Sequence, residues 1–249
     1  MCASAGIYSL ERLMRESPLD RVTVVQVLSD FVREHAPLKR AHYDRERGEW
    51  RPVPAYQPSL LPTSDVQAAV TVIGRRPDPS TADHINFSGA DLSYIDTSRG
   101  NFDGADLEEA SLVKADLTNA SLDRASFRMA DLTLTTWETA RARKAIFSEA
   151  RMEAAYLKYA DLSESSFFMT ITARSGFTQT HLEGADFSDA DLRRTGFSRA
   201  YLTGAKFKGA RLEGAQLHTA LGLTVIGCAR MDGQTLLPKD VKVSPTCTD

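Results

Sequence analysis

The stretch Ala185-Asp186-Phe187-Ser188-Asp189-Ala190-Asp191-Leu192 shows a unit of five residues, in which a small residue is followed two places later by a large apolar one. The same spacing continues in both directions without insertion or deletion. Every fifth residue from Phe87 to Leu217 is Leu, Phe, Met or Trp, except Thr97, Ala142 and Thr172. The residue two places earlier is Ala in most pentads. A repeat of this regularity decides the fold before any single element is considered.

A period of five fits neither the 3.6-residue turn of a helix nor the two-residue alternation of a strand. The chain must therefore turn once per pentad to keep its apolar residues on one side. A second period supports four pentads per coil: positions 87, 107, 127, 147, 167, 187 and 207 are all Phe except Leu107, and the series from Leu92 to Leu212 is mainly Leu. Stacked coils of this kind bury one continuous core.

This pattern resembles the pentapeptide-repeat family, whose motif is A-(D/N)-(L/F)-(S/T)-x. The resemblance implies an all-β fold, a right-handed quadrilateral parallel β-helix with an N-terminal α-helical region. The central Leu or Phe and the Ala would point inward, and the other three residues of each pentad outward. At about 4.8 Å between adjacent strands, the repeats would form a rod about 32 Å long.

We expect three parts: an N-terminal helical region with a Pro-rich loop and a cap (residues 1–84), the β-helix (85–217), and a C-terminal cap and tail (218–249). Apolar residues at helical spacing predict helices within 7–14, 24–31 and 66–73. This region also resembles the one that precedes the repeats in actinobacterial pentapeptide proteins. Because an open solenoid end exposes its core, the third helix and residues 77–79 should close the first coil and residues 221–231 the last.

Composition indicates a folded protein of net charge −3, and the lack of a membrane span and of a secretory signal predicts a cytoplasmic location. No apolar run approaches the roughly 20 residues that span a bilayer, and the N-terminus has no basic segment of the kind that opens a secretory signal. Three scattered cysteines, at positions 2, 228 and 247, are expected to be reduced. The five histidines are spaced too widely for a zinc site, so no metal or cofactor is expected.

No catalytic residue is assigned. The sequence has no phosphate-binding G-x-x-x-x-G-K, no G-x-S-x-G and no H-E-x-x-H motif. Its many aspartates, such as Asp186 and Asp191, fall one place before an inward Leu or Phe and are explained by the repeat. We therefore expect a non-catalytic protein-interaction module with an unknown protein partner, because a fold alone does not identify one.

The alternative is DNA mimicry, since the resemblance implies relatives that bind and protect DNA gyrase, a topoisomerase, and so confer antibiotic resistance. Residues 85–217 carry a net charge of −3, whereas duplex DNA of that length carries roughly 19 negative charges. Only a local acidic band remains as a candidate: Asp103, Asp106, Glu108, Glu109 and Asp123. Around Ala142, which breaks the motif, three cationic residues point outward: Arg141, Arg143 and Lys144. We expect this to be a tolerated irregular rung rather than an anion or partner site. Direct nucleic-acid binding is not expected.

Four outward positions are apolar and form a candidate interaction patch: Met129, Ile146, Phe168 and Met169. Leu134 and Ile171 flank them. Contiguous exposed apolar surface of this kind marks interaction sites. Two explanations remain open: the helices of residues 6–33 fold back and cover the patch, or the patch is the interface of a homodimer or of another protein.

Overall fold

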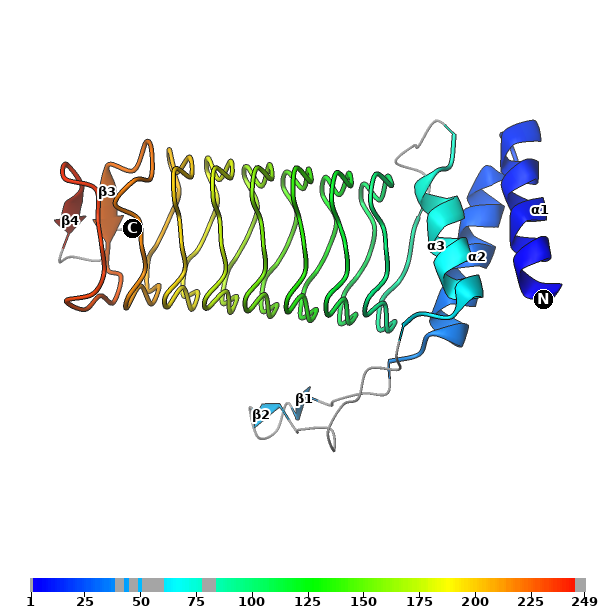
Figure 1. The fold of residues 1–249 in the computed structure, drawn as a ribbon, viewed down its shortest axis with the longest axis horizontal. Helices are drawn as coiled ribbons and strands as arrows, with labels where there is room; N and C mark the ends of the chain where they lie inside the picture. The colour runs from blue at the N-terminus through cyan, green and yellow to red at the C-terminus, as the bar shows by residue number, and fades with distance from the viewer. Residues whose placement is uncertain (1, 39–42, 45–48, 51–60, 78–83, 245–249) are drawn as a thin grey trace.

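The computed structural model describes the chain except for residues 1, 39–42, 45–48, 51–60, 78–83 and 245–249. Helices α1 (Cys2–Glu16), α2 (Arg21–His35) and α3 (Ser64–Gly74) precede the repeats. The strands β1 (Tyr43–Asp44) and β2 (Glu49–Trp50) pair antiparallel, and β3 (Val225–Gly227) pairs parallel with β4 (Lys242–Ser244). Most of the predicted Pro-rich loop lies outside the described residues. Figure 1 shows a rod with the three helices at one end and β3 and β4 at the other.

The rod is a parallel β-helix whose coils contain twenty residues. Parallel bridges join residues twenty positions apart, as in Asn86 with Asp106, Ile146 with Ser166 and Tyr201 with Leu221. Since twenty residues are four pentads, the predicted second period is confirmed. We number the coils from residue 85, so that the first coil comprises residues 85–104 and the seventh 205–224. A further bridge, from Gln216 to Leu236, extends the stacking beyond the last regular pentad.

The core consists of stacked rings and aliphatic chains. The rings of Phe127, Phe147, Phe167, Phe187 and Phe207 lie parallel, with neighbouring centroids 4.6–5.3 Å apart. A second aromatic series, two pentads away, meets the first ladder edge to face: Trp137, Phe177 and Phe197. Offset stacks and perpendicular contacts are the two favoured aromatic geometries. The core is therefore an interlocked pair of aromatic ladders.

Hydroxyl residues replace Ala at several inward positions of the later coils. Each buried hydroxyl finds a main-chain carbonyl: Thr170 donates to Phe147 O at 2.6 Å, Thr180 to Leu157 O at 2.6 Å and Thr195 to Thr172 O at 2.9 Å. Because a buried polar group without a partner costs roughly 1–3 kcal/mol, these bonds explain why such substitutions are tolerated.

The corners of the coil explain the rest of the motif. From Gly89 to Gly214, the residue two places after the centre of each pentad lies in the left-handed region even where it is not glycine, as at Glu109 (φ 58°) and Met169 (φ 56°). The residue before the centre is often Asp, whose carboxylate accepts the N–H two residues later; Asp106 accepts from Glu108 at 2.9 Å and Asp186 from Ser188 at 2.9 Å. Such side-chain turns are typical of Asp and Asn.

The helices pack on the end of the rod. The N–H of Asn101 donates to Gly74 O of α3 at 2.9 Å, and the N–H of Asp91 donates to Ala36 O, which follows α2, at 2.7 Å. Val66, Ala69, Val70 and Ile73 of α3 are buried, as their spacing predicts, whereas Leu13 and Val27 of the first two helices are exposed. α3 therefore contacts the first coil, where the sequence places a cap, and residues 78 and 79 of that expected cap lie outside the described residues. The helices do not fold back over the sides, because Ile146, Phe168 and Met169 stay exposed.

The C-terminal end is closed differently. Arg230 and Leu236 continue the ladders of Arg211 and Gln216, and the N–H of Cys228 approaches Ser244 O. Cys228 is disulfide-bonded, which corrects the expectation that all the cysteines are reduced. Proximity of a thiol partner in the folded chain, rather than sequence spacing, decides whether such a bond forms.

Candidate interaction surface

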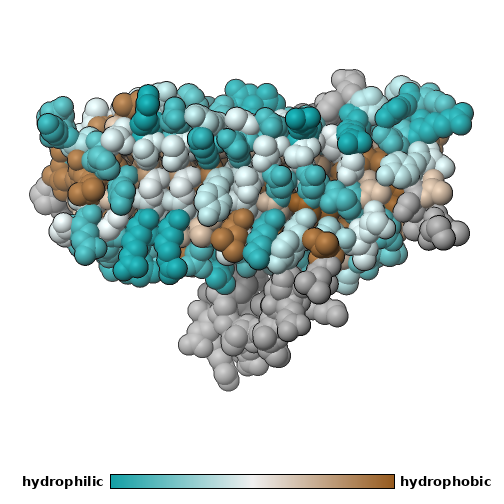
Figure 2. Space-filling view, in the orientation of Figure 1, coloured by the Kyte–Doolittle hydropathy of each residue, from teal (hydrophilic) through white to brown (hydrophobic). Residues whose placement is uncertain are grey.

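Three apolar side chains lie together on the outside of the fourth and fifth coils. Ile146, Phe168 and Met169 are 42%, 40% and 52% exposed. Their coils are adjacent, since Ile146 bridges Ser166 and the N–H of Glu149 donates to Phe168 O at 2.9 Å. Strand spacing therefore places the three residues within about 5 Å of one another along the rod. Figure 2 shows one side of the rod, on which isolated apolar side chains interrupt a mainly polar surface.

Met129 was predicted to belong to this exposed cluster, but only 9% of its surface is accessible. Its backbone is at a corner, with φ 58°, as the register requires. The register decides where the Cα–Cβ bond points, whereas an unbranched methionine chain adapts to the surface around it. Of the two residues expected to flank the cluster, Leu134 is exposed and Ile171 is half-buried.

The predicted acidic band is divided between two sides of the rod. Asp106, Glu108 and Glu109 line one surface depression together with Ser88 and Gly89. Asp103 and Asp123 lie in another column, where the hydroxyl of Ser121 donates to Asp103 at 2.6 Å and the N–H of Asp123 donates to the same carboxylate at 2.9 Å. The five carboxylates therefore do not form one continuous acidic surface.

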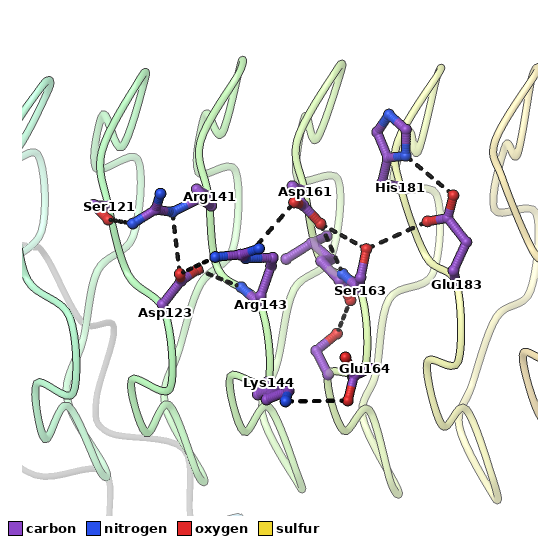
Figure 3. Close-up of polar contacts among 12 residues, drawn as sticks. Ser121, Asp123, Arg141, Arg143, Lys144, Asp161, Ser163, Glu164, His181 and Glu183 are labelled. Carbon is purple, nitrogen blue, oxygen red and sulfur yellow. Dashed lines mark hydrogen bonds and ion pairs between the residues drawn. The ribbon is translucent and has the colours of Figure 1, made fainter.

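Cations of the irregular rung neutralise part of the acidic band. Arg141 lies 3.1 Å from Asp123 and 3.6 Å from Asp103, and Arg143 lies 3.1 Å from Asp123. Lys144 pairs with Glu164 at 3.3 Å. Figure 3 shows these side chains reaching along the rod to neighbouring coils. The pairing raises the pKa of Arg143, chiefly through its hydrogen bond with Asp123. These contacts support the prediction of a tolerated rung rather than an anion site.

Two further ion-pair groups lie on the rod, one between neighbouring coils and one within a single pentad. Arg128 lies between Glu108, at 3.0 Å, and Glu149, at 3.2 Å. Arg193 pairs with Asp191 at 2.6 Å. Burial raises the pKa of Asp191, but hydrogen bonds from Arg193 outweigh this effect and hold the pKa below its ordinary value. Neither group is among the expectations from the sequence. The partners of Arg128 are about twenty residues away and follow from the coil length, whereas Arg193 and Asp191 belong to the same pentad.

Among the described residues, no group of three or more His, Cys, Asp or Glu side chains is placed to hold a metal ion. Within the same part of the chain, no helix is long and apolar enough to span a bilayer. Two surface features bear on function: the apolar cluster, defined as Ile146, Phe168 and Met169, and the acidic depression of Asp106, Glu108 and Glu109.

Comparison with known proteins gives a family match. A model described as pentapeptide repeats matches residues 101–136, 177–209 and 197–220, with eight copies of the repeat. No curated relative matches the chain.

Solved structures of pentapeptide repeat proteins are also similar to the chain. HetL, involved in heterocyst differentiation regulation in the cyanobacterium Nostoc, is 25% identical, with a TM-score of 0.33 over 63% of this chain and 80% of that one. QnrB1, a plasmid-mediated fluoroquinolone resistance protein, is 17% identical, with a TM-score of 0.32 over 62% and 79%. Rfr23 from the cyanobacterium Cyanothece is 24% identical, with a TM-score of 0.22 over 49% and 63%.

Proposed function

Because this chain belongs to the pentapeptide-repeat family, we propose that it is a non-catalytic protein-interaction module. In this proposal the β-helix is right-handed and quadrilateral, and a protein partner binds one of its flat sides. The observation that carries the proposal is the exposed apolar cluster of Ile146, Phe168 and Met169 on adjacent coils. A rigid side that presents such a cluster offers a preorganised surface.

The energetics support a binding role for the cluster. Single exposed apolar residues are normal on protein surfaces, but contiguous ones mark interaction sites. Each Å² of apolar surface removed from water contributes about 25 cal/mol of favourable free energy. A partner that covers the ring of Phe168 would gain such binding free energy without the cost of reorganising the rod. Aromatic residues are also enriched among those that dominate binding free energy.

The carboxylates support a non-catalytic reading. Catalytic acids and bases need their pKa values matched to the reaction and a site that excludes water. Here the regularly spaced aspartates accept main-chain N–H groups of their own turns, as Asp131 does from Thr133 at 3.0 Å and Asp161 from Ser163 at 3.1 Å. Their repetition along the rod is thus explained by folding.

Affinity capture with matched variants tests the proposal. Phe168→Asp places a charge in the apolar cluster and should abolish capture of the partner while leaving the melting temperature within a few degrees of the wild type. Tyr156→Asp is the control, since Tyr156 is also an exposed aromatic residue but lies two pentads away in the coil. Equal loss of capture in both variants, or in neither, would contradict the proposal.

Topoisomerase protection by partial DNA mimicry is the second candidate. The depression lined by Asp106, Glu108 and Glu109 favours it, because three carboxylates of one pentad meet there. Ion pairs with arginines weaken the case for mimicry, because they reduce the negative potential of the acidic band. They involve Asp103, Glu108 and Asp123. If the protein relieves inhibition of purified DNA gyrase, replacing the three carboxylates of the depression by Lys should abolish that relief. Unchanged relief would exclude mimicry through this surface.

The sequence favours a cytoplasmic location, which is a reducing compartment. The disulfide of Cys228 favours an oxidising one, since stable disulfides are typical of oxidising compartments. Alkylation of freshly lysed cells, followed by mass spectrometry of the Cys228 peptide, distinguishes them. A free thiol at Cys228 in the cell would support the cytoplasmic location, and a disulfide there would argue against it.

A further inference from the structure

The apolar cluster occupies the middle of one side of the rod, which we call the phenylalanine-ladder face. In each coil this face consists of the pentad centred on a residue of the first ladder. Its outward residues are the one before the centre and the two after it. The fourth coil contributes Ile146, Ser148 and Glu149, and the fifth contributes Ser166, Phe168 and Met169.

Charge is distributed unequally on either side of this centre. On the N-terminal side, the second coil carries Asp106, Glu108 and Glu109 on the face. On the C-terminal side, the seventh coil carries Lys206 and Lys208. The acidic and basic groups are each two and a half coils from the midpoint between the fourth and fifth coils. At about 4.8 Å per coil, both lie about 12 Å from that midpoint.

A two-fold axis through the midpoint, perpendicular to the face, brings complementary groups together. It exchanges the fourth coil with the fifth, the third with the sixth and the second with the seventh. The same rotation exchanges the two edges of the face. Ile146 of one copy then meets Met169 of the other, and Lys206 meets Glu109. Arg128, the basic group of the third coil, meets the sixth coil with Asp186 and Asp189.

We propose that the partner of this face is a second copy of the chain, packed antiparallel about that axis. This inference rests on the proposed interaction function and names its partner. In an isologous interface, the same surface of both copies must be complementary to itself under the two-fold rotation. The phenylalanine-ladder face meets this condition. A parallel arrangement is disfavoured, because it sets Lys206 against Lys206 and the second-coil carboxylates against one another. The antiparallel dimer covers the apolar cluster and pairs its charged ends.

Sedimentation equilibrium with charge-reversal variants tests the arrangement. Lys206→Glu and Glu109→Lys each place like charges opposite one another twice per dimer and should weaken self-association at least tenfold. In an equimolar mixture of the two variants, each heterodimer regains both opposite-charge contacts. The mixture should therefore associate as strongly as the wild type, and increasing salt should reduce the difference. Circular dichroism of each variant confirms that the fold is kept.

Two results would overturn the dimer: a wild-type chain that is monomeric at 100 times the concentration used for affinity capture, or a mixture that associates no better than the single variants. The interaction function fails separately. A monomeric chain whose partner capture still depends on Phe168 leaves that function intact and rejects only the dimer. Self-association that is unchanged by Phe168→Asp overturns the proposed dimer, and the interaction function fails as well only if affinity capture is also unchanged.

Discussion

The guanidinium of Arg143 donates a hydrogen bond of 3.1 Å to the carboxylate of Asp123, twenty residues earlier and one coil away. The main-chain N–H of Arg143 donates to the same carboxylate at 2.9 Å, and Arg141 approaches it at 3.1 Å. One acidic residue thus connects two coils through side-chain and main-chain contacts. The relationship explains why charges that form bands along the sequence partly neutralise one another on the rod.

Asp123→Asn should lower the free energy of unfolding by at most about 1 kcal/mol, because the lost ion pairs are at the surface and Asn still accepts the main-chain N–H. Urea denaturation measures this cost. A double-mutant cycle with Arg143→Gln is the control and should show a coupling energy of a few tenths of a kcal/mol. A loss of more than 3 kcal/mol would show that the network is part of the folding core rather than of its surface.

Phe147→Ala should cost about 3–5 kcal/mol, because the ring is fully buried and its removal leaves a cavity in the stacked ladder. Its centroid lies 4.8 Å from that of Phe167 and 5.6 Å from that of Trp137. Phe168→Ala, one coil further along and 40% exposed, is the matched control and should cost less than 1.5 kcal/mol on the same reasoning. Similar losses for both variants in chemical denaturation would mean that the inward register is wrong.

Gly100→Ala should destabilise the junction between the helical cap and the first coil by about 1–3 kcal/mol, the range for overpacking. A Cβ at Gly100 would lie 2.3 Å from the ring of Phe102 and 3.0 Å from Thr97 O. The same ring packs closely on Gly74, where an added Cβ would lie 2.8 Å from it. Gly176→Ala is the control, since nothing lies within 4 Å of its Cβ position. Equal melting temperatures for the two variants would contradict the close approach.

The ion pair of Asp191 should make stability depend on pH in acid. Its pKa is lower in the folded chain than the ordinary value near 3.9 of the unfolded chain. The carboxylate therefore contributes stability that is complete above the unfolded pKa and is lost as the pH falls through the folded pKa. The difference in unfolding free energy between wild type and Asp191→Asn should be constant at neutral pH and shrink below about pH 4. Arg193→Gln should reduce this pH dependence, and a difference that persists unchanged to pH 2 would contradict the assignment.

The repeat made most of the solenoid predictable. A period of five assigned Phe147 and Leu192 to the interior, and a period of twenty predicted the bridges that join Ile146 to Ser166. The register also assigned Ile146, Phe168 and Met169 to the surface, where they lie. These predictions succeed because every coil imposes the same backbone geometry, so that the position in the pentad decides the direction of the side chain.

Features that depend on flexible side chains, or on contacts between residues far apart in the sequence, could not be predicted from the repeat. Met129 lies against the rod because its long side chain is not constrained by the register. The arginine partners of Asp123 come from the next coil, and the acidic band was defined from neighbours in sequence rather than from columns along the rod. The sequence places the third helix at the first coil, but the contact that joins them there, from the N–H of Asn101 to Gly74 O, is not encoded in any local pattern.

The central claim is that the cluster of Ile146, Phe168 and Met169 is a binding surface, and methyl NMR with a soluble paramagnetic agent tests it most directly. In the dilute chain, the agent should broaden the methyl signals of Ile146 and Met169. Saturation with the binding partner, or concentration of the chain if it pairs with itself, should protect these two signals. Leu19 is the control, since it is highly exposed on the helical cap and should be broadened under both conditions. If the methyl groups of Ile146 and Met169 remain as accessible as those of Leu19 when the partner is bound, the cluster is not the binding surface.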